Sequence, residues 1–271
     1  MKHKHSGLPV LIGIPFDGKS SYLRGAAEAP NKIREALACD ASNTWTECGV
    51  DLGFSEVYGD AGNLVVSDEK AFEVIESAIG NLVDEGKRPI SLGGDHSITY
   101  PLVKAFAKRY RDLTIFHFDA HPDLYDEFEG NRLSHACPFA RIMEAGLAKR
   151  LVQIGIRTMN GHQREQAKKF GVEVVEMRTL PAYEKLKADG PVYITFDMDV
   201  LDPAFAPGIS HREPGGMTVR EAIAHLHAID GDGDIVGADV VEYNPVRDID
   251  GLTATVAAKI VKEILGIMVA G

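Results

Sequence analysis

The sequence predicts an α/β protein built on a doubly wound, mostly parallel sheet of about eight strands. Apolar runs of strand length, rich in β-branched residues, alternate with helical patterns along the whole chain, which is the order expected of a parallel sheet. The strand-like runs are apolar almost without interruption, as in strands that helices cover on both faces. No linker, internal repeat or low-complexity tract divides the 271 residues, so we expect a single domain over residues 1–271.

The expected strands are short and apolar, and helical patterning separates them. In chain order the strands are residues 10–14, 89–92, 113–118, 151–156, 172–175, 192–196 and 235–241, with a weaker candidate at 54–58. The expected helices are residues 31–38, 68–85, 98–109, 137–145, 161–170, 219–229 and 253–268. Thr218 and Glu221 have the spacing of a capping box, which marks the start of the helix at 219–229.

The composition is that of an acidic globular protein. Hydrophobic residues make up 45% of the chain, enough for a real core. Lysine and arginine number 29 against 40 aspartates and glutamates, which gives a net charge of −11. This balance argues against a nucleic-acid partner and is compatible with a cationic substrate.

The cysteines and the N-terminal segment indicate the cellular compartment. Cys39, Cys48 and Cys137 are an odd number without Cys-x-x-Cys spacing, so neither a disulfide framework nor a zinc ribbon is expected. The basic start leads into an apolar run that is too short for a signal sequence or a membrane span. We therefore expect a cytoplasmic protein without membrane attachment, whose residues 1–8 form a flexible tail.

Four acidic or histidine-bearing segments follow directly after expected strands. In a parallel α/β sheet the carboxyl ends of the strands share one edge, where ligands bind, so these segments should converge. Six side chains in three of them form a candidate cage for divalent metals: His96, Asp119, His121, Asp123, Asp197 and Asp199. The fourth segment supplies Glu242.

The spacing and chemistry of this set favour two metals. Residues two apart in an extended chain point to the same side, which applies to Asp119, His121 and Asp123 and to Asp197 and Asp199. Two divalent ions balance four carboxylates, whereas one would leave an uncompensated charge. Carboxylates and imidazoles without thiolates suit Mn²⁺, although Zn²⁺, Co²⁺ and Ni²⁺ stay open. Paired metals lower the pKa of a shared water, so a hydrolase is expected.

The motifs resemble those of the ureohydrolases, the arginase and agmatinase family. They are Gly-Gly-Asp-His-Ser at 93–97, Phe-Asp-Ala-His-Pro-Asp at 118–123, Ser-His-Ala at 134–136, Phe-Asp-Met-Asp at 196–199 and Glu-Tyr-Asn-Pro at 242–245. The resemblance runs from about residue 10 to the C-terminus and is greatest for plant-type arginases and their bacterial relatives. It implies a three-layer α/β/α sandwich, two Mn²⁺ ions, a homo-oligomer (a trimer or hexamer), and hydrolysis of a guanidino group to urea and an amine.

The resemblance also implies roles for individual residues. One metal would be held by His96, Asp119, Asp123 and Asp197, and the other by Asp119, His121, Asp197 and Asp199. The catalytic residues would be Asp123, His135 and Glu242: Glu242 pairs with the guanidinium, His135 shuttles protons, and Asp123 helps to move a proton to the leaving amine.

Residues around this set receive weaker assignments. Asn131 and Ser134, with His135 and Glu242, are candidate substrate-binding residues in a polar loop that follows the 119–123 cluster. Asp95 is expected to brace His96, and His117 to be a core or outer-shell group. The roles of His211 and Cys137 stay open.

The substrate is not fixed by these patterns. Asp126, Glu127 and Glu129 would favour an amine tail, whereas Asn131, Arg132 and Ser134 would receive a carboxylate. The balance favours L-arginine, with agmatine or another linear guanidino compound as alternatives. A mononuclear zinc deacetylase is the rival enzyme class, and a non-enzymatic regulatory relative is the rival outside enzymes; metal stoichiometry and urea release would separate them.

Overall fold

The structure is a computed structural model that describes residues 7–180, 186–230 and 234–270. Within these ranges one eight-stranded sheet has the order β2-β1-β3-β10-β8-β4-β5-β6, with every neighbouring pair parallel. The strands are β1 (Pro9–Gly13), β2 (Gly59–Asn63), β3 (Arg88–Leu92), β4 (Thr114–Phe118), β5 (Arg150–Ile156), β6 (Glu173–Glu176), β8 (Val192–Asp197) and β10 (Ile235–Val241). The short strands β7 (Leu186–Lys187) and β9 (Ile229–Asp230) pair separately.

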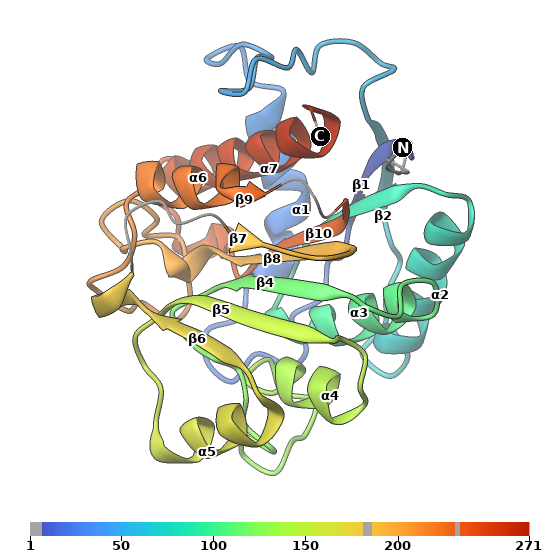
Figure 1. Ribbon diagram of the computed structural model, residues 1–271. Helices are drawn as coiled ribbons and strands as arrows, with labels where there is room; N and C mark the ends of the chain where they lie inside the picture. Colours follow the sequence, from blue (N-terminus) through green and yellow to red (C-terminus); the bar gives the residue numbers. More distant parts are fainter. Residues whose placement is uncertain (1–6, 181–185, 231–233, 271) are drawn as a thin grey trace.

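Helices cover both faces of the sheet, which confirms the three-layer α/β/α arrangement (Figure 1). One face carries α1 (Ala29–Leu37), α6 (Val219–His227) and α7 (Leu252–Ala270), and the other carries α2 (Ala71–Asp84), α3 (Thr99–Ala107), α4 (Pro138–Glu144) and α5 (Gly161–Phe170). Strand β4 shows how the two cores divide: Phe116 belongs to the core beneath the first set of helices, and its neighbour Ile115 belongs to the core beneath the second.

The predicted helices and strong strands are all present, with ends shifted by a few residues. The weak strand expected at 54–58 is wrong, because the chain pairs with β1 only from Gly59 onward. Strand β2 reads Gly-Asp-Ala-Gly-Asn and lies at the sheet edge, mostly exposed. Its residues lack the apolar, β-branched character on which the prediction depended.

Local sequence fixes the helix ends where it is most informative. Thr218 Oγ1 accepts a hydrogen bond from Glu221 N, and the Glu221 carboxylate accepts one from Thr218 N, which confirms the capping box. Helix α5 begins with a second box, formed by Asn160 and Gln163, and ends at Gly171 in the left-handed conformation with φ 66°.

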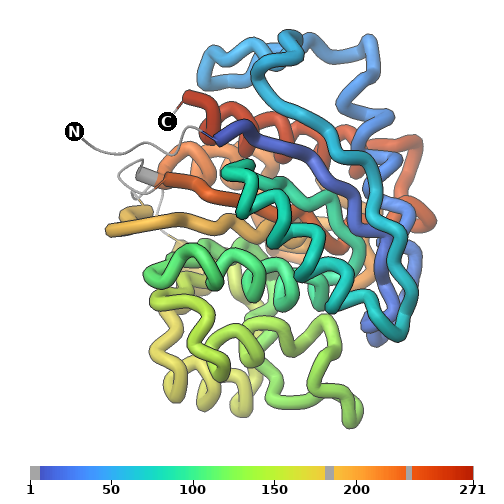
Figure 2. The backbone as a smooth tube through the Cα atoms, turned by 90° about the vertical axis from the view of Figure 1, so that its right-hand side faces the viewer, coloured from blue at the N-terminus to red at the C-terminus, as the bar shows by residue number. Residues whose placement is uncertain are grey.

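The segment between α1 and β2 crosses the outer side of α7, where Figure 2 shows it in light blue beside the red helix. Glu47 N donates to the Glu263 carboxylate at 3.1 Å, and Lys262 Nζ of α7 donates to the Asn43 carbonyl. The Glu47 side chain pairs with Arg220 of α6 and lies 3.0 Å from Lys259 of α7. Polar contacts therefore attach this long connection to the helical layer.

The described part of the N-terminus is held to the sheet. The Gly7 carbonyl accepts a hydrogen bond from Arg88 Nε at 2.6 Å, and the Leu8 carbonyl accepts one from Arg88 N at 3.0 Å. The expectation of a flexible tail over residues 1–8 is therefore wrong at these two positions, because hydrogen bonds from Arg88 of β3 hold them in place. Residues 1–6 lie outside the described ranges.

The three cysteines are free thiols. Cys39 and Cys48 are exposed free thiols, and Cys137 is a buried one. Burial raises the pKa of the Cys137 thiol to about 12, so it stays protonated and unreactive at neutral pH.

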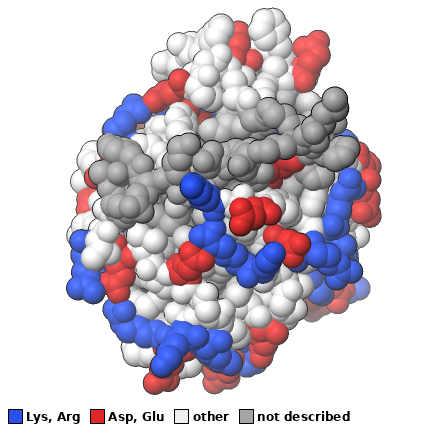
Figure 3. Space-filling view, in the orientation of Figure 1, with Lys and Arg blue, Asp and Glu red and all other residues white. Residues whose placement is uncertain are grey.

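On the face shown in Figure 3, basic and acidic side chains are interspersed rather than gathered by sign. Within the described ranges, no helix combines the length and apolar character needed to cross a bilayer.

Candidate metal centre and substrate cavity

Four neighbouring strands in the middle of the sheet deliver the predicted site. Strands β3, β10, β8 and β4 are adjacent in that order. His96 follows β3, Glu242 follows β10, Asp197 ends β8, and Asp119 follows β4. Because all four strands run parallel, their carboxyl ends place these side chains at one edge.

The His96 ring lies at the centre of the carboxylates. Its Nδ1 atom is 3.1 Å from Asp119 Oδ2, 3.2 Å from Asp123 Oδ2 and 3.1 Å from Asp197 Oδ2. This nitrogen is fully buried and makes no hydrogen bond within the described residues. A buried imidazole nitrogen that faces three carboxylate oxygens without a hydrogen bond has the surroundings of a metal ligand. The residues therefore fit a metal.

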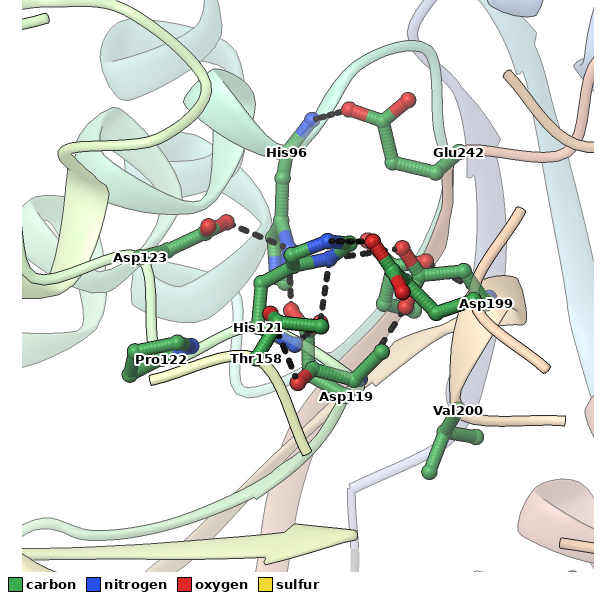
Figure 4. A network of polar contacts seen from close by, with 12 residues as sticks. His96, Asp119, His121, Pro122, Asp123, Thr158, Asp199, Val200 and Glu242 are labelled. Atoms are coloured by element: carbon green, nitrogen blue, oxygen red, sulfur yellow. Dashed lines mark hydrogen bonds and ion pairs between the residues drawn. The ribbon is translucent and has the colours of Figure 1, made fainter. Parts of the chain in front are cut away.

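A second group shares Asp119 with the first. His121 Nδ1 lies 2.9 Å from Asp199 Oδ2 and 3.5 Å from Asp119 Oδ1. Asp119 thus directs one carboxylate oxygen to each histidine. Figure 4 shows Asp119, Asp123 and Asp199 directed toward the His96 and His121 rings, with the Glu242 carboxylate at the backbone nitrogen of His96. The structure brings all six predicted metal ligands together.

Crowded carboxylates give the cluster a large electrostatic cost in the absence of cations. Burial, followed by the charges of Asp199 and Asp119, raises the pKa of Asp197 well above its usual range. Burial also raises the pKa of Asp199, with Asp119 adding to the effect. Buried carboxylates that repel one another need positive charge nearby, which bound divalent ions would supply.

The second nitrogen of His96 is fixed by residues that the sequence reasoning missed. His96 Nε2 lies 2.9 Å from Thr195 Oγ1, which donates to Asp239 Oδ1 at 2.6 Å. Tyr193 and Thr99 also donate to the Asp239 carboxylate. Thr195 and Asp239 point to the same side of adjacent strands, and nothing in their local sequence distinguishes them from core residues.

The expectation that Asp95 braces the His96 ring is wrong. The Asp95 carboxylate accepts hydrogen bonds from Ser97 N at 3.0 Å and Lys19 N at 2.8 Å, and so caps the turn that begins at His96. Asp95 orders the backbone, whereas Thr195 orients the ring. His117 has the expected outer-shell position, because its Nε2 lies 2.7 Å from Asp119 Oδ2.

Two candidate catalytic residues have left-handed backbone conformations. Asp123 has φ 47° and Glu242 has φ 62°. Such conformations cost non-glycine residues about 1–3 kcal/mol and cluster at functional sites. At both positions the backbone directs a carboxylate into the site rather than along the strand.

Glu242 and His135 form a buried pair beside the metal cluster. Glu242 Oε1 lies 2.9 Å from His135 Nδ1 and accepts a hydrogen bond from His96 N at 2.9 Å. Burial opposes the charge on His135, but Glu242 overrides it and raises the His135 pKa to about 9. Burial likewise opposes the charge on Glu242, but His135 lowers the Glu242 pKa to about 2. The pair is therefore ionic at neutral pH.

A cavity of about 150 Å³ opens onto both groups. Residues absent from the predicted set contribute much of its wall. The lining residues are Ser21, His121, Asp123, Tyr125, Phe128, His135, Ala136, Thr158, Gln163, Asp197, Asp199, His211 and Glu242. Ser21 comes from the loop after β1, where the only signal available in the sequence was its position after a strand.

Asn131 and Ser134 do not line this cavity. The Asn131 side chain accepts a hydrogen bond from Leu133 N at 2.9 Å and so shapes the loop. The Ser134 carbonyl accepts from Cys137 N at 2.9 Å, at the entry to α4. Both residues support the segment that carries His135, and their contact with substrate stays a prediction.

Comparisons with known proteins agree with this geometry. The family model described as Arginase family matches residues 9–266. The chain is 49% identical to Arginase 1, mitochondrial, of Arabidopsis thaliana, over 94% of this chain and 79% of that protein. It is 36% identical to Agmatinase of Bacillus subtilis (strain 168), over 94% of this chain and 90% of that protein. The solved structure of Arginase from Medicago truncatula matches with a TM-score of 0.92 and 47% identity, over 97% of this chain and 88% of that chain.

Fold, site and relatives together define the class: the chain is a ureohydrolase, an enzyme that hydrolyses C–N bonds. Within that class it belongs to the arginase family. The expectation of a cytoplasmic location is contradicted, because relatives at 47% and 49% identity carry the names mitochondrial or chloroplastic/mitochondrial.

Proposed function

We propose that this ureohydrolase hydrolyses L-arginine to ornithine and urea with two Mn²⁺ ions. The observation that carries the proposal is one cavity in which the His96 carboxylate cluster adjoins the Glu242–His135 pair. The higher identity to a plant arginase than to an agmatinase, 49% against 36%, favours arginine over agmatine.

The proposed metal ligands are the two imidazoles and the four carboxylates around them. His96, Asp119, Asp123 and Asp197 would hold one ion, and His121, Asp119, Asp197 and Asp199 the other. When bound, paired ions of this kind lower the pKa of a water from 15.7 toward ~7, which provides a nucleophile at neutral pH. A ligand set with two separate imidazoles and a shared carboxylate favours two ions over the single zinc of a deacetylase.

Glu242 is the proposed anchor for the guanidinium. Its Oε1 atom accepts a hydrogen bond from His96 N and lies 2.9 Å from His135 Nδ1, whereas its Oε2 atom makes no hydrogen bond within the described residues. That oxygen can accept from a guanidinium, and the ionised carboxylate strengthens the contact. The position beside the metal cluster would orient the guanidinium carbon toward it.

His135 and Asp123 are the proposed proton carriers. His135 Nδ1 lies 2.9 Å from Glu242 Oε1, and His135 Nε2 lies 2.8 Å from Ser21 Oγ. It lines the cavity, so it can give a proton to the leaving amine and recover one from solvent. Asp123 lines the same cavity and faces His96, where it can accept a proton from the attacking water.

The deciding experiment is a urea assay on the Mn²⁺-loaded protein with arginine, agmatine, guanidinobutyrate and other linear guanidines. We expect kcat/KM to be highest for arginine. A higher kcat/KM for agmatine or another guanidine would change the assigned substrate but leave the enzyme class, ureohydrolase, unchanged. If none of these compounds gives urea, the result would favour the non-enzymatic alternative.

Metal analysis of the same samples tests the proposed ligands. The wild-type protein should hold two Mn²⁺ per chain, and Asp197→Ala should lower both metal content and activity. Glu69→Ala is the matched control, because Glu69 is an exposed carboxylate outside the cavity lining. One zinc per chain in the active protein would instead favour the deacetylase.

We further propose that the chain works as a homo-oligomer, a trimer or hexamer, as the family resemblance implies. Light scattering of the purified protein would give the mass directly. A mass near that of one chain, 29.4 kDa, would exclude this assembly.

A further inference from the structure

His211 lines the cavity and has no role in the proposed mechanism. Its ring packs against three others, with centroid distances of 5.1 Å to His135, 5.6 Å to Tyr22 and 6.1 Å to His121. Within the described residues, neither ring nitrogen of His211 makes a hydrogen bond. An imidazole that lines a polar cavity with both nitrogens uncommitted is available to a ligand.

Its position beside the Glu242–His135 pair completes a set of three donors. His135, His211 and Glu242 each offer one ligand atom, and these atoms all lie within 4.8 Å of one another. Around a tetrahedral ion with bonds of about 2.0–2.1 Å, ligand atoms are about 3.3 Å apart. Small side-chain rotations would therefore close the three donors around one cation.

We propose that His135, His211 and Glu242 form a third cation site, selective for Zn²⁺, whose occupation blocks the guanidinium position and inhibits the enzyme. This inference rests on the proposed function, because inhibition presupposes that Glu242 receives the substrate. The site is distinct from the His96 and His121 clusters, since its three residues supply none of the proposed Mn²⁺ ligands.

The donor types explain the selectivity. Two imidazoles and one carboxylate, with water from the cavity in the fourth position, are a ligand set that zinc adopts. Nitrogen donors bind Zn²⁺ more tightly than Mn²⁺, whereas the neighbouring cluster is dominated by carboxylates. Zinc at low concentration would therefore fill the third site while Mn²⁺ stays in the other two.

Ser21 prepares His135 for this role. Ser21 Oγ lies 2.8 Å from His135 Nε2, which leaves Nδ1 directed at Glu242 Oε1, 2.9 Å away. Metal-binding histidines generally have their second nitrogen fixed in this manner. A cation entering between Nδ1 and the carboxylate replaces the proton that now joins them, and that proton leaves to solvent.

The test uses the Mn²⁺-loaded enzyme, dialysed against Zn²⁺ in the absence of substrate, with both metals measured per chain. We expect one additional zinc with the Mn²⁺ content unchanged. In urea assays, added zinc should raise the apparent KM and leave kcat unchanged, because zinc and the guanidinium compete for Glu242. Since the dialysis contains no substrate, it reports on the site even if the proposed substrate is wrong.

Two variants assign the zinc to this site. His211→Asn should weaken zinc binding at least tenfold, since loss of an outer-shell partner alone weakens metal sites by about 10–100-fold. His211→Phe should do the same while keeping the ring contacts with Tyr22 and His135. His227→Asn is the matched control: His227 lies on α6 against Glu263, at 2.9 Å, and should leave zinc binding unchanged.

Three results would overturn the inference. They are the absence of a further bound zinc, a loss of Mn²⁺ equal to the zinc gained, which indicates exchange at the Mn²⁺ positions, and undiminished zinc affinity in both His211 variants.

Discussion

His96 shows how much of a site can depend on one side chain held from two directions. Its Nδ1 atom faces three carboxylates, and its Nε2 atom is tied through Thr195 to Asp239. Both supporting residues are fully buried. Metal ligands depend on such outer contacts for their orientation and basicity. The series of hydrogen bonds from Asp239 of β10 through Thr195 of β8 to His96 should therefore influence the metal affinity.

Thr195→Val should therefore weaken Mn²⁺ binding about 10–100-fold. The substitution keeps the shape of the side chain and removes the hydroxyl that orients His96. Thr99→Val is the matched control, because Thr99 donates to the same Asp239 carboxylate at 3.0 Å without a recorded hydrogen bond to His96. Titration of the metal-free proteins measures both affinities; equal affinities for the two variants would contradict the positioning role of Thr195.

Glu242→Gln should retain the metals but lower kcat/KM for the guanidino substrate by about 30- to 1,000-fold, equivalent to roughly 2–4 kcal/mol. The neutral amide cannot supply the charge that the guanidinium needs, and it leaves His135 without a charged partner. Glu69→Gln, at an exposed position outside the cavity lining, is the control. Full activity in the Glu242 variant would remove this residue from the substrate site.

At the scale of elements, the connection between α1 and β2 illustrates stabilisation by surface charge. Arg220 of α6 and Lys259 of α7 both contact Glu47. The hydrogen bond from Arg220 is the main cause that lowers the Glu47 pKa to about 2, from 4.5. A depressed carboxyl pKa adds stability above the unfolded value, and that stability is lost as the pH falls through the folded value.

Glu47→Gln should consequently lower the free energy of unfolding at pH 7 by less than about 1 kcal/mol, as is usual for exposed ion pairs. The difference from wild type should persist down to pH ~4.5 and shrink as the pH falls toward ~2. Urea unfolding across this range measures it. A difference that grows on acidification would have the wrong sign for a Glu47 pKa lowered by its partners.

At the scale of the whole molecule, the metal cluster couples the two halves of the sheet. Its proposed ligands lie at the carboxyl ends of β3, β8 and β4; β8 and β4 are neighbours, and β10 lies between β3 and β8. Ions bound there would join segments from residue 96 to residue 199 and would neutralise carboxylates that otherwise repel one another. Anything that binds only the folded state adds to its stability.

Mn²⁺ should therefore raise the melting temperature of the chelator-treated protein. One site at a free concentration of 100 times its Kd contributes about 2.7 kcal/mol, which corresponds to roughly 5–10 °C for a chain of this size. Differential scanning fluorimetry at increasing Mn²⁺ provides the measurement, with Asp197→Ala as the variant expected to respond less. A melting temperature independent of Mn²⁺ would argue against ions at this position.

The sequence by itself determined the alternation of strands and helices, because apolar periodicity reflects which faces are buried. It also determined the six metal-ligand candidates, since clustered acids and histidines after parallel strands can meet only at one edge. The edge strand β2 was not predicted at its observed position, because a mostly exposed strand of glycine, aspartate, alanine and asparagine has no such periodicity.

Only the tertiary structure decided which residues support the site. The strand order places Thr195 next to Asp239 and beneath His96, and loop packing brings Ser21 and His211 to the wall of the cavity. These contacts join residues that are far apart in the chain and have no distinctive spacing. Local sequence specifies which face of an element is buried, whereas the partner across that face is fixed only when the whole sheet is assembled.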